Sequence, residues 1–425
     1  ALEADGRTGD FLIAKAAYSL RSLGTRQATL AATGDTVARA DGKFVVQVRR
    51  SSDDALKSFT ADEVTDGTLL AFVKPIQTVG TAVNGTGSFD NYTVSNLSTT
   101  GFSADNSAGG TGSAGFPYVF KDEDVLLVKY TVTNFSSTSG LSPALRGVSA
   151  TNSVTGKTNS GTTFTANGTY TDTLIATANG THLMYADGNT GSYTISDFEI
   201  VSHFSNGFVK TWYDQSVTTE QGNVATGNHA VQATAASQPK IVNVGALVAD
   251  NGIGGIDFDG TTSSRSLVAP SVSGLTGSLS IFSTSVKGNS SGNTVSLSKS
   301  TDNAKYFSIK ENSTTSTANP RNSTNVSVSA SVSGSDRLTF GVTTGETSFG
   351  VGALGGTLVT STSDYGSDFG SGNLDQIAIG LLRTVSPTGF FNGRIREILV
   401  YDSDQTVNRG AIEANIGEAY SITGI

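Results

Sequence analysis

Gly207-Phe-Val-Lys-Thr-Trp-Tyr-Asp-Gln-Ser216 and the nearby Asn228-His-Ala-Val-Gln232 form the stretch around which the chain is organised. It contains the only tryptophan of the protein, and it follows a long block rich in Gly, Ser, Thr and Asn. The spacing of its apolar and aromatic residues predicts a strand, which Asp214-Gln-Ser ends with a turn. We interpret this strand as the return of a domain that began near residue 10 and was interrupted.

The composition indicates an all-β protein built from two or three domains. Of the 425 residues, 50 are Gly and only 15% are charged, which is well below the usual quarter. Small polar residues and Gly turns between short apolar alternations are typical of extracellular and virion proteins. The 36% hydrophobic residues, which include 21 Phe and 12 Tyr, can form packed cores, so wholesale disorder is disfavoured.

Several function classes are excluded by the same numbers. The chain has no cysteine, which excludes disulfides and thiolate metal sites. Its net charge is −9 and we find no basic stripe, so no nucleic-acid partner is expected. No apolar run approaches the roughly 20 residues that span a bilayer, so no membrane partner is expected either. The sequence starts at Ala1 without a signal peptide, and we expect a trimmed product.

The patterns upstream of the organising stretch predict the first part of a jelly-roll domain over residues 1–79. Residues 10–23 are predicted to be a helix, because Leu12, Ala16, Leu20 and Leu23 share one helical face. Residues 43–49 predict a strand. Thr60-Ala-Asp-Glu63 has the spacing of a capping box and predicts a short helix through Phe72.

Residues 80–203 are predicted to be a second β-sandwich inserted into the first domain. Its predicted strands, whose spacing suits antiparallel pairing, are residues 125–132, 168–175, 182–185 and 192–200. An insertion at an exposed loop is tolerated, since closing a longer loop adds little entropy cost.

Residues 204–425 are predicted to complete the outer jelly roll. The predicted strands are residues 254–260, 278–283, 306–309, 337–342, 374–380 and 390–401, and residues 407–420 predict a closing helix. The Ser-, Thr- and Asn-rich residues 311–333 are expected to be a long loop or an irregular edge. The expected fold class is therefore an all-β, concanavalin-like jelly-roll sandwich with an inserted β-sandwich and a few short helices.

Three blocks of the outer domain resemble the catalytic sandwich of fungal-type arabinofuranosidase B. They are Ala17-Tyr-Ser-Leu-Arg-Ser-Leu23 with Val45-Val-Gln-Val-Arg-Arg-Ser-Ser-Asp53, Trp212-Tyr-Asp-Gln-Ser216 with Gly227-Asn-His-Ala-Val-Gln232, and the C-terminal helix. The ending Phe391-Asn-Gly-Arg-Ile-Arg-Glu-Ile-Leu-Val-Tyr401 also resembles laminin-G-type jelly rolls. Domains of this appearance also occur in phage structural and host-recognition proteins.

The resemblance implies a retaining glycosidase, which needs two carboxylates facing each other across the sugar. Glu311 lies where the family has its nucleophile, although a solvated loop Glu is the alternative. The loop that holds the family's acid reads Gly380-Leu-Leu-Arg-Thr-Val-Ser-Pro-Thr-Gly389 here and has no carboxylate. Without a proton donor the rate falls roughly 10²–10⁴-fold, so we expect no enzyme activity of this kind.

Two further groups of residues are candidate binding sites. An aromatic face can pack on a sugar ring, so Trp212, Tyr213, Asp214, Asn228 and His229 are the carbohydrate-binding candidates; the alternative is that Trp212 lies in the core. Asp257 and Asp259 offer hard oxygens for Ca²⁺, although their spacing matches no EF-hand loop and ordinary turns are the alternative. No other cofactor is expected.

The sequence favours a non-enzymatic virion protein, such as a phage fibre, appendage or decoration protein. Its expected partners are other virion proteins, further copies of itself, with a trimer as the first expectation, and a host cell-surface glycan. A secreted arabinofuranosidase-like glycoside hydrolase and a bacterial surface adhesin remain alternatives. The expected location is the virion, or the extracellular space or cell surface under those alternatives.

Overall fold

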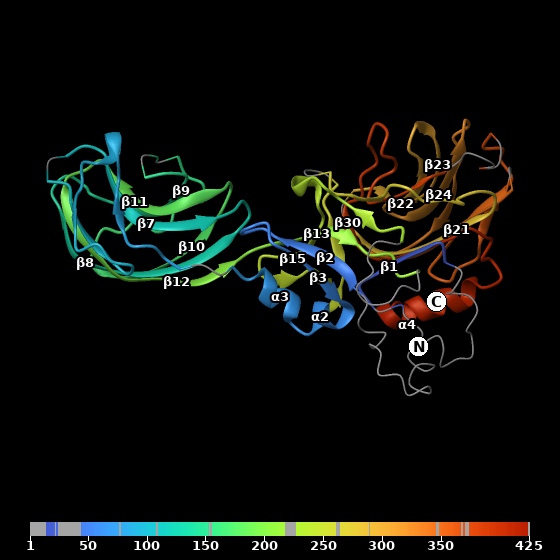
Figure 1. Cartoon of the computed structure of the whole chain (residues 1–425), viewed down its shortest axis with the longest axis horizontal. Coiled ribbons are helices and arrows are strands. Elements are labelled where there is room, and N and C mark those ends of the chain that lie inside the picture. Colours follow the sequence, from blue (N-terminus) through green and yellow to red (C-terminus); the bar gives the residue numbers. More distant parts are fainter. Residues whose placement is uncertain are drawn as a thin grey trace.

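The computed structural model is an all-β protein made of two antiparallel β-sandwiches joined through a narrow junction (Figure 1). It describes residues 14–21, 23, 44–75, 78–107, 109–151, 153, 155–216, 227–260, 264–288, 290–345, 348–366, 369 and 374–423. The expected fold class, a jelly-roll sandwich with a second sandwich inserted, is confirmed. No helix among the described residues is long and apolar enough to cross a membrane.

The inserted sandwich consists of two sheets, ordered β10-β8-β12-β6-β5 and β4-β7-β11-β9. Its strands are β4 (Val83–Asn84), β5 (Thr93–Ser95), β6 (Phe102–Asp105), β7 (Gly112–Phe120), β8 (Val125–Ser137), β9 (Ala144–Val148), β10 (Gly168–Ile175), β11 (Gly180–Asp187) and β12 (Gly191–Phe204), with a 3₁₀ turn at Gly87–Phe89. Its own core is unusually aromatic: Phe102, Phe116, Tyr130, Phe164 and Tyr185 are all buried there. The predicted boundaries of 80 and 203 stay a prediction; residue 80 precedes β4, and residue 203 is the penultimate residue of β12.

The outer sandwich is a single hydrogen-bonded network of strands that closes on itself. Before the insertion it contains β1 (Ala16–Ser19), β2 (Phe44–Arg50) and β3 (Leu56–Thr60). After the insertion it contains β13 (Gly207–Trp212), β14 (Ala230–Val231), β15 (Lys240–Asn243), β16 (Ala246–Leu247), β19 (Ile256–Phe258), β20 (Leu267–Ala269), β21 (Leu279–Lys287), β22 (Gly292–Lys299), β23 (Asp302–Glu311), β24 (Thr315–Asn322), β25 (Val328–Ser331), β26 (Asp336–Thr344), β27 (Ser348–Ala353), β28 (Val359–Ser361), β29 (Gln376–Ile379) and β30 (Gly393–Tyr401). A separate hairpin, β17 (Ala249–Asp250) and β18 (Ile253–Gly254), and a 3₁₀ turn at Ala235–Ser237 complete it.

The predicted N-terminal helix is wrong where the chain is described, because Ala16–Ser19 is a strand that pairs antiparallel with β30. All four residues are buried. Ala16 and Tyr18 face the main core, while Ala17 faces a second cluster beneath the closing helix. A strand that is buried on both faces does not alternate apolar with polar residues. The period of two that identifies a strand is therefore absent from this sequence, and the spacing of its apolar residues also fits a helix. Residues 10–13 and 22 of the predicted helix lie outside the described residues.

Of the two alternatives for residues 311–333, a long loop or an irregular edge, the loop is wrong, because the segment contains strands β24 and β25. Their Ser, Thr and Asn side chains alternate with Ala318, Val328 and Ala330, which reach the main core or its edge. Asn and Pro are depleted from strands, and here the pairing of β24 with β23 outweighs that propensity.

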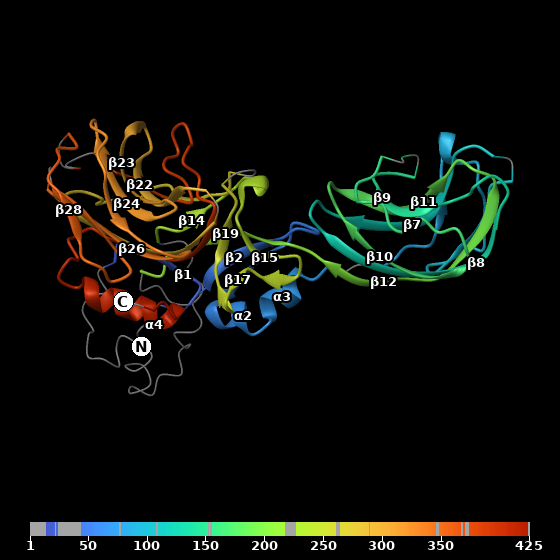
Figure 2. The same cartoon turned by 180° about the vertical axis from the view of Figure 1, so that it is seen from behind.

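The closing helix is confirmed as α4 (Arg409–Tyr420). Ile412, Ile416 and Tyr420 pack against Phe282 and Leu399 on the outer face of the sheet, and the helix lies below the strands (Figure 2).

The predicted capping box is confirmed at the start of α2 (Ala61–Thr65), which is followed by α3 (Thr68–Val73). Glu63 N donates to Thr60 Oγ1 at 3.3 Å, and Thr60 N donates to Glu63 Oε2 at 3.0 Å. Thr60→Ala should therefore lower the free energy of unfolding by about 1 kcal/mol. Denaturant titration would measure the loss, with Thr65→Ala as the control outside the cap; equal losses for both variants would contradict the prediction.

Candidate functional site

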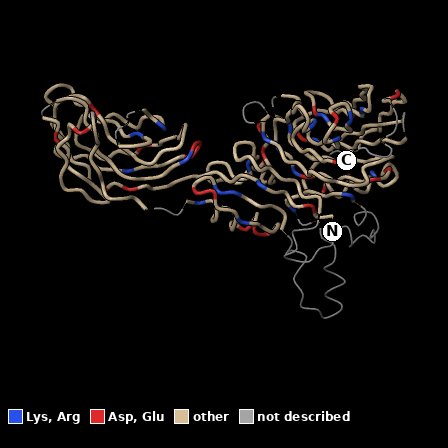
Figure 3. The backbone as a smooth tube through the Cα atoms, turned by 45° about the horizontal axis from the view of Figure 1, so that its top comes forward, with Lys and Arg blue, Asp and Glu red and all other residues tan. Residues whose placement is uncertain are grey.

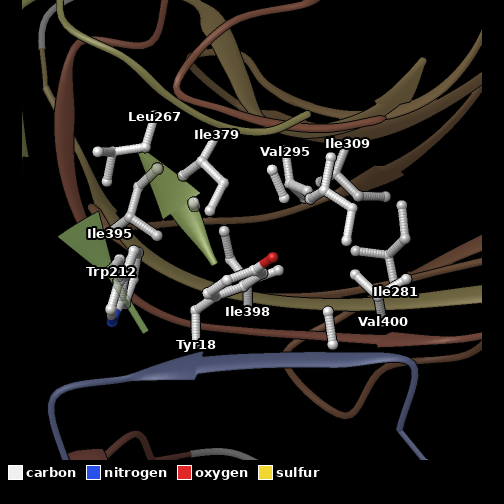
Figure 4. Close-up of a cluster of buried hydrophobic side chains, with 14 of the residues drawn as sticks. Tyr18, Trp212, Leu267, Ile281, Val295, Ile309, Ile379, Ile395, Ile398 and Val400 are labelled. Carbon is white, nitrogen blue, oxygen red and sulfur yellow. The ribbon is translucent and has the colours of Figure 1, made fainter. Parts of the chain in front are cut away.

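The organising stretch lies inside the outer sandwich, and its tryptophan is part of the core. Trp212 is 0% exposed, and its ring centroid lies 5.8 Å from that of Tyr18. Figure 4 shows the two rings among the Ile, Leu and Val side chains of the main core. The prediction of Trp212 as a sugar platform is therefore wrong, because no face of the indole is open to a ligand.

Asp214 joins three separate segments through its buried carboxylate. Oδ1 accepts hydrogen bonds from the backbone N–H groups of Ala17 and Ser216, both at 2.9 Å, and Oδ2 accepts one from Asn228 N at 2.9 Å. The side chain thus ties β1 and the turn after β13 to the segment before β14. Both carboxylate oxygens are occupied by the protein itself.

The neighbours of Asp214 extend this clasp, which we define as Tyr213, Asp214, Gln215, Asn228 and His229. Gln215 Nε2 donates to Ser19 O at 2.8 Å, and Asn228 Nδ2 donates to Lys15 O at 2.8 Å. His229 Nδ1 accepts from Asp214 N at 3.0 Å, while Tyr213 OH shares a 2.8 Å hydrogen bond with Ser58 Oγ. The structure does bring the predicted carbohydrate-binding residues together, but their polar atoms form hydrogen bonds with other residues of the protein.

Glu311 is enclosed within the outer sandwich and is 0% exposed. Its carboxylate accepts hydrogen bonds from Ser316 Oγ at 2.7 Å and Thr339 Oγ1 at 2.8 Å, and Arg337 Nε lies 3.3 Å away as an unaligned ion pair. Burial raises the pKa of Glu311, although the two hydroxyls and Arg337 offset part of the rise. A nucleophile must contact its sugar, and this carboxylate has no open side. Its burial therefore fits neither a glycosidase nucleophile nor the alternative of a solvated loop residue.

A pocket of about 320 Å³ lies instead where the two sandwiches meet. Eleven of its lining residues belong to the outer sandwich and one, Glu123, to the inserted sandwich. The lining residues are Glu123, Lys240, Asp257, Phe258, Asp259, Arg265, Val286, Lys287, Gly288, Asn392, Gly393 and Arg394. Figure 3 shows basic and acidic positions interspersed along the backbone of both sandwiches. Its volume falls in the usual range of ligand pockets, about 300–1,000 Å³.

Strand register builds one wall of the pocket. Lys240 on β15 pairs with Asp257 on β19, which pairs with Arg394 on β30, which pairs with Val286 on β21. Residues directly opposite in an antiparallel sheet place their side chains on the same face. A row of three charged residues therefore crosses the neighbouring strands β15, β19 and β30.

Arg265 lines the pocket and is the most deeply buried of its cations. It is only 5% exposed, and its guanidinium lies 5.4 Å from the centre of the Phe208 ring. Its Nε is buried and has no hydrogen-bond partner among the described residues. A buried donor without a partner costs about 1–3 kcal/mol, which the ion pair and the ring contact of the same guanidinium offset in part.

Glu123 reaches the pocket from the tight turn between β7 and β8. Its Oε2 lies 2.8 Å from Lys240 Nζ, and its Oε1 lies 3.6 Å from Arg265 Nη2. The next residue, Asp124, is fully buried, and its Oδ2 lies 2.8 Å from His203 Nε2. Ser51 Oγ of the outer sandwich donates to Asp124 Oδ1 at 3.3 Å. This junction holds the Glu123 turn against the outer sandwich.

The two Ca²⁺ candidates, Asp257 and Asp259, both line this pocket, and cationic side chains line it with them. Burial raises the pKa of Asp257, and the charges of Arg265, Arg394 and Lys240 oppose the rise. Within the described part of the chain, no group of three His, Cys, Asp or Glu side chains is arranged to hold a metal ion. Calcium sites need six to eight oxygen ligands, so these two aspartates fit a polar ligand better than a cation.

Sequence reasoning missed the basic side of the pocket. Lys240, Arg265, Lys287 and Arg394 are isolated charges in four different segments, and only the register of the sheet assembles them. The one available signal was the pair Asp257 and Arg394, since each interrupts an apolar strand. A charge within a strand indicates a face with a partner, although it does not identify that partner.

Comparisons with known proteins assign no family. No protein-family model and no curated protein matches the chain, so the arabinofuranosidase resemblance stays a prediction. Among solved structures, the chain is similar to the Ruminococcus gnavus IT-sialidase CBM40 bound to α2,3-sialyllactose, with 15% identity over 36% of this chain and 90% of that chain, at a TM-score of 0.29.

Two other solved structures show a similarly weak likeness. The NanB sialidase from Streptococcus pneumoniae matches with 16% identity over 32% of this chain and 23% of that chain, at a TM-score of 0.27. The binding domain of Botulinum Neurotoxin DC in complex with SialylT matches with 13% identity over 39% of this chain and 42% of that chain, at a TM-score of 0.29. Likenesses of this strength do not identify a function for the chain.

Proposed function

We propose that this protein is a non-enzymatic, lectin-like binding protein that holds a glycan in the pocket between its two sandwiches. The observation that carries the proposal is the pocket of about 320 Å³ at the junction, whose lining gathers the cations Lys240, Arg265 and Arg394 beside the carboxylates of Glu123 and Asp257. A hydroxyl-rich ligand can form hydrogen bonds with both kinds of group.

The chemistry of the lining favours a hydroxyl-rich ligand. Sugar hydroxyls both donate and accept hydrogen bonds, whereas Arg and Lys only donate and ionised Asp and Glu only accept. The pocket presents both kinds side by side in the row Lys240, Asp257 and Arg394. Neighbouring hydroxyls of one sugar ring can satisfy such an alternating row. A purely apolar ligand would leave these charges desolvated and unpaired.

The wider setting that we propose is a virion surface, with the protein acting as a fibre, appendage or decoration protein. The motives are the turn-rich composition, with 50 Gly and no cysteine, and the nesting of one sandwich in another. A homo-oligomer, with a trimer as the first expectation, would raise the avidity of a weak sugar site. Antibody labelling of native material tests this setting: label on cell surfaces would replace it with an adhesin, and a monomer by light scattering would contradict the oligomer.

Replacement of Arg265 tests the pocket itself. In a glycan-array screen of the full chain, Arg265→Gln should weaken the bound glycans at least tenfold, because a charge-assisted hydrogen bond contributes about 1.5–3 kcal/mol. Lys129→Gln is the matched control, since Lys129 is an exposed cation on β8 outside the pocket. Circular dichroism would verify that both variants are folded. Absence of glycan binding by the wild type, or equal binding by Arg265→Gln, would contradict the proposal.

A further inference from the structure

The two sandwiches are not held together by a shared hydrophobic core. The buried apolar residues that the structure describes fall into three clusters, and each cluster contains residues of one sandwich only. Phe204 of the inserted sandwich reaches the turn at Gly245 but stays 39% exposed. The junction is narrow in both views of the chain (Figures 1 and 2). The orientation of the inserted sandwich therefore depends largely on polar contacts at this junction.

One of the two chain connections across the junction is fixed to the outer sandwich. β12 and β13 are separated by two residues, the second of which is the buried Asn206. Asn206 N donates to Ser51 Oγ at 3.0 Å, and Asn206 Oδ1 accepts from Val244 N at 2.8 Å. The other connection lies between α3 and Val79, which packs against the core of the inserted sandwich. Asn206 is therefore the point about which the inserted sandwich can turn.

The turn between β7 and β8 carries Glu123 as part of the inserted sandwich. Glu123 has a φ of +67°, in the left-handed region that a residue other than glycine rarely adopts. Its N–H donates to Ala176 O at 3.1 Å, and the neighbouring Asp124 Oδ2 accepts from Lys121 N at 2.8 Å and lies 2.8 Å from His203 Nε2. A strained residue of this kind persists where its surroundings fix it. All these partners belong to the inserted sandwich, so Glu123 moves with it.

Lys240 and Arg265 receive the Glu123 carboxylate on the outer sandwich. Both cations are held beside Phe208, with Lys240 Nζ 6.0 Å and the Arg265 guanidinium 5.4 Å from the ring centre. The Lys240 and Arg265 side chains are 11% and 6% exposed, whereas that of Glu123 is 42% exposed. Salt screens an ion pair that water reaches. We call the contact of Glu123 with Lys240 and Arg265 the latch.

We propose that the latch holds the inserted sandwich in one orientation, and that its opening lets this sandwich swing about Asn206 while both sandwiches stay folded. Glu123 is the one residue that the inserted sandwich contributes to the pocket lining. A swing therefore removes one wall of the pocket and exposes Lys240 and Arg265. The latch itself requires no ligand, and only its consequence for glycan binding rests on the proposed function.

Spin labels on the two sandwiches test the latch directly. The chain has no cysteine, so labels attach only where cysteines are introduced. Ala71 on α3 and Thr171 on β10 are exposed positions, one on each sandwich. Pulsed electron resonance on Ala71→Cys/Thr171→Cys should give one narrow distance distribution at low salt. Glu123→Ala in this background should increase the fraction of molecules outside the main peak about two- to fivefold.

Raised salt should broaden the distribution of the otherwise native chain in the same way, and should have little further effect on Glu123→Ala. This salt series keeps the test valid if circular dichroism shows that Glu123→Ala is unfolded. Glu199→Ala is the matched control, since Glu199 is an exposed carboxylate of β12 outside the pocket.

Three results would overturn the latch: a broad distribution in the native background at low salt, no broadening with either salt or Glu123→Ala, or equal broadening by Glu199→Ala. A salt effect that persists unchanged in folded Glu123→Ala would also overturn it, because the screened contact would then lie elsewhere. Absence of glycan binding would overturn the proposed function and leave the latch standing.

Discussion

Replacement of Asp214 by alanine is expected to lower the free energy of unfolding by about 3–5 kcal/mol. The carboxylate accepts backbone hydrogen bonds from Ala17, Ser216 and Asn228 in a site that is 4% exposed. Its removal leaves three donors without their acceptor, and each hydrogen bond to a charged group contributes about 1.5–3 kcal/mol, with partial replacement by water. The effect should be large because one side chain joins three segments.

Chemical denaturation followed by tryptophan fluorescence would measure this loss, since Trp212 lies in the core and is two residues from Asp214 in the sequence. Asp402→Ala is the control: Asp402 is exposed, and its nearest cation, Lys15 Nζ, is 3.7 Å away, so its loss should be about 0–1 kcal/mol. Asp214→Asn should fall between the two, because the amide keeps one acceptor. A destabilisation of Asp214→Ala no greater than that of Asp402→Ala would contradict the structural role of the clasp.

Glu311→Ala is expected to cost a similar amount, about 3–5 kcal/mol, because it leaves the buried Arg337 without a counter-charge. Arg337 is 0% exposed, and Ser316 and Thr339 would also lose the acceptor of their hydroxyl groups. Arg337, Ser316 and Thr339 are all 0% exposed, so these groups depend on partners within the protein. The side chain of Glu311 therefore compensates a charge that lies between the strands β23, β24 and β26.

Denaturant midpoints of Glu311→Ala and of Glu418→Ala would check this expectation, since Glu418 is an exposed residue of α4. Glu311→Gln also tests the glycosidase alternative. If the chain hydrolyses an arabinofuranoside and this glutamine variant is folded but inactive, Glu311 acts as the nucleophile in a conformation that opens its site. Full stability of Glu311→Ala would refute the buried ion-pair interpretation.

The residues that carry the family resemblance do a different task from the one that the resemblance implies. Asp214, Gln215 and Asn228 use their polar atoms to hold β1 and neighbouring loops. These hydrogen bonds account for the polar residues of the clasp without a bound sugar.

Local patterns were sufficient for a large part of the architecture. Alternating apolar residues predicted β10 at Gly168–Ile175 to the residue, and the spacing Thr60 to Glu63 predicted the cap of α2. Glycine-rich turns and scarce charge predicted an all-β fold. Each of these features depends on neighbours within a few residues, so the sequence alone specifies it.

The conformation of β1 and the set of residues that line the pocket depend on the tertiary structure. Ala16–Ser19 is a strand because two different cores cover its two faces, and no local pattern records what lies on either side. The pocket joins Glu123 to Lys240, Arg265 and Arg394 through strand register and the docking of one sandwich on another. Both the strand β1 and the pocket form through contacts between residues that are more than a hundred positions apart in the sequence.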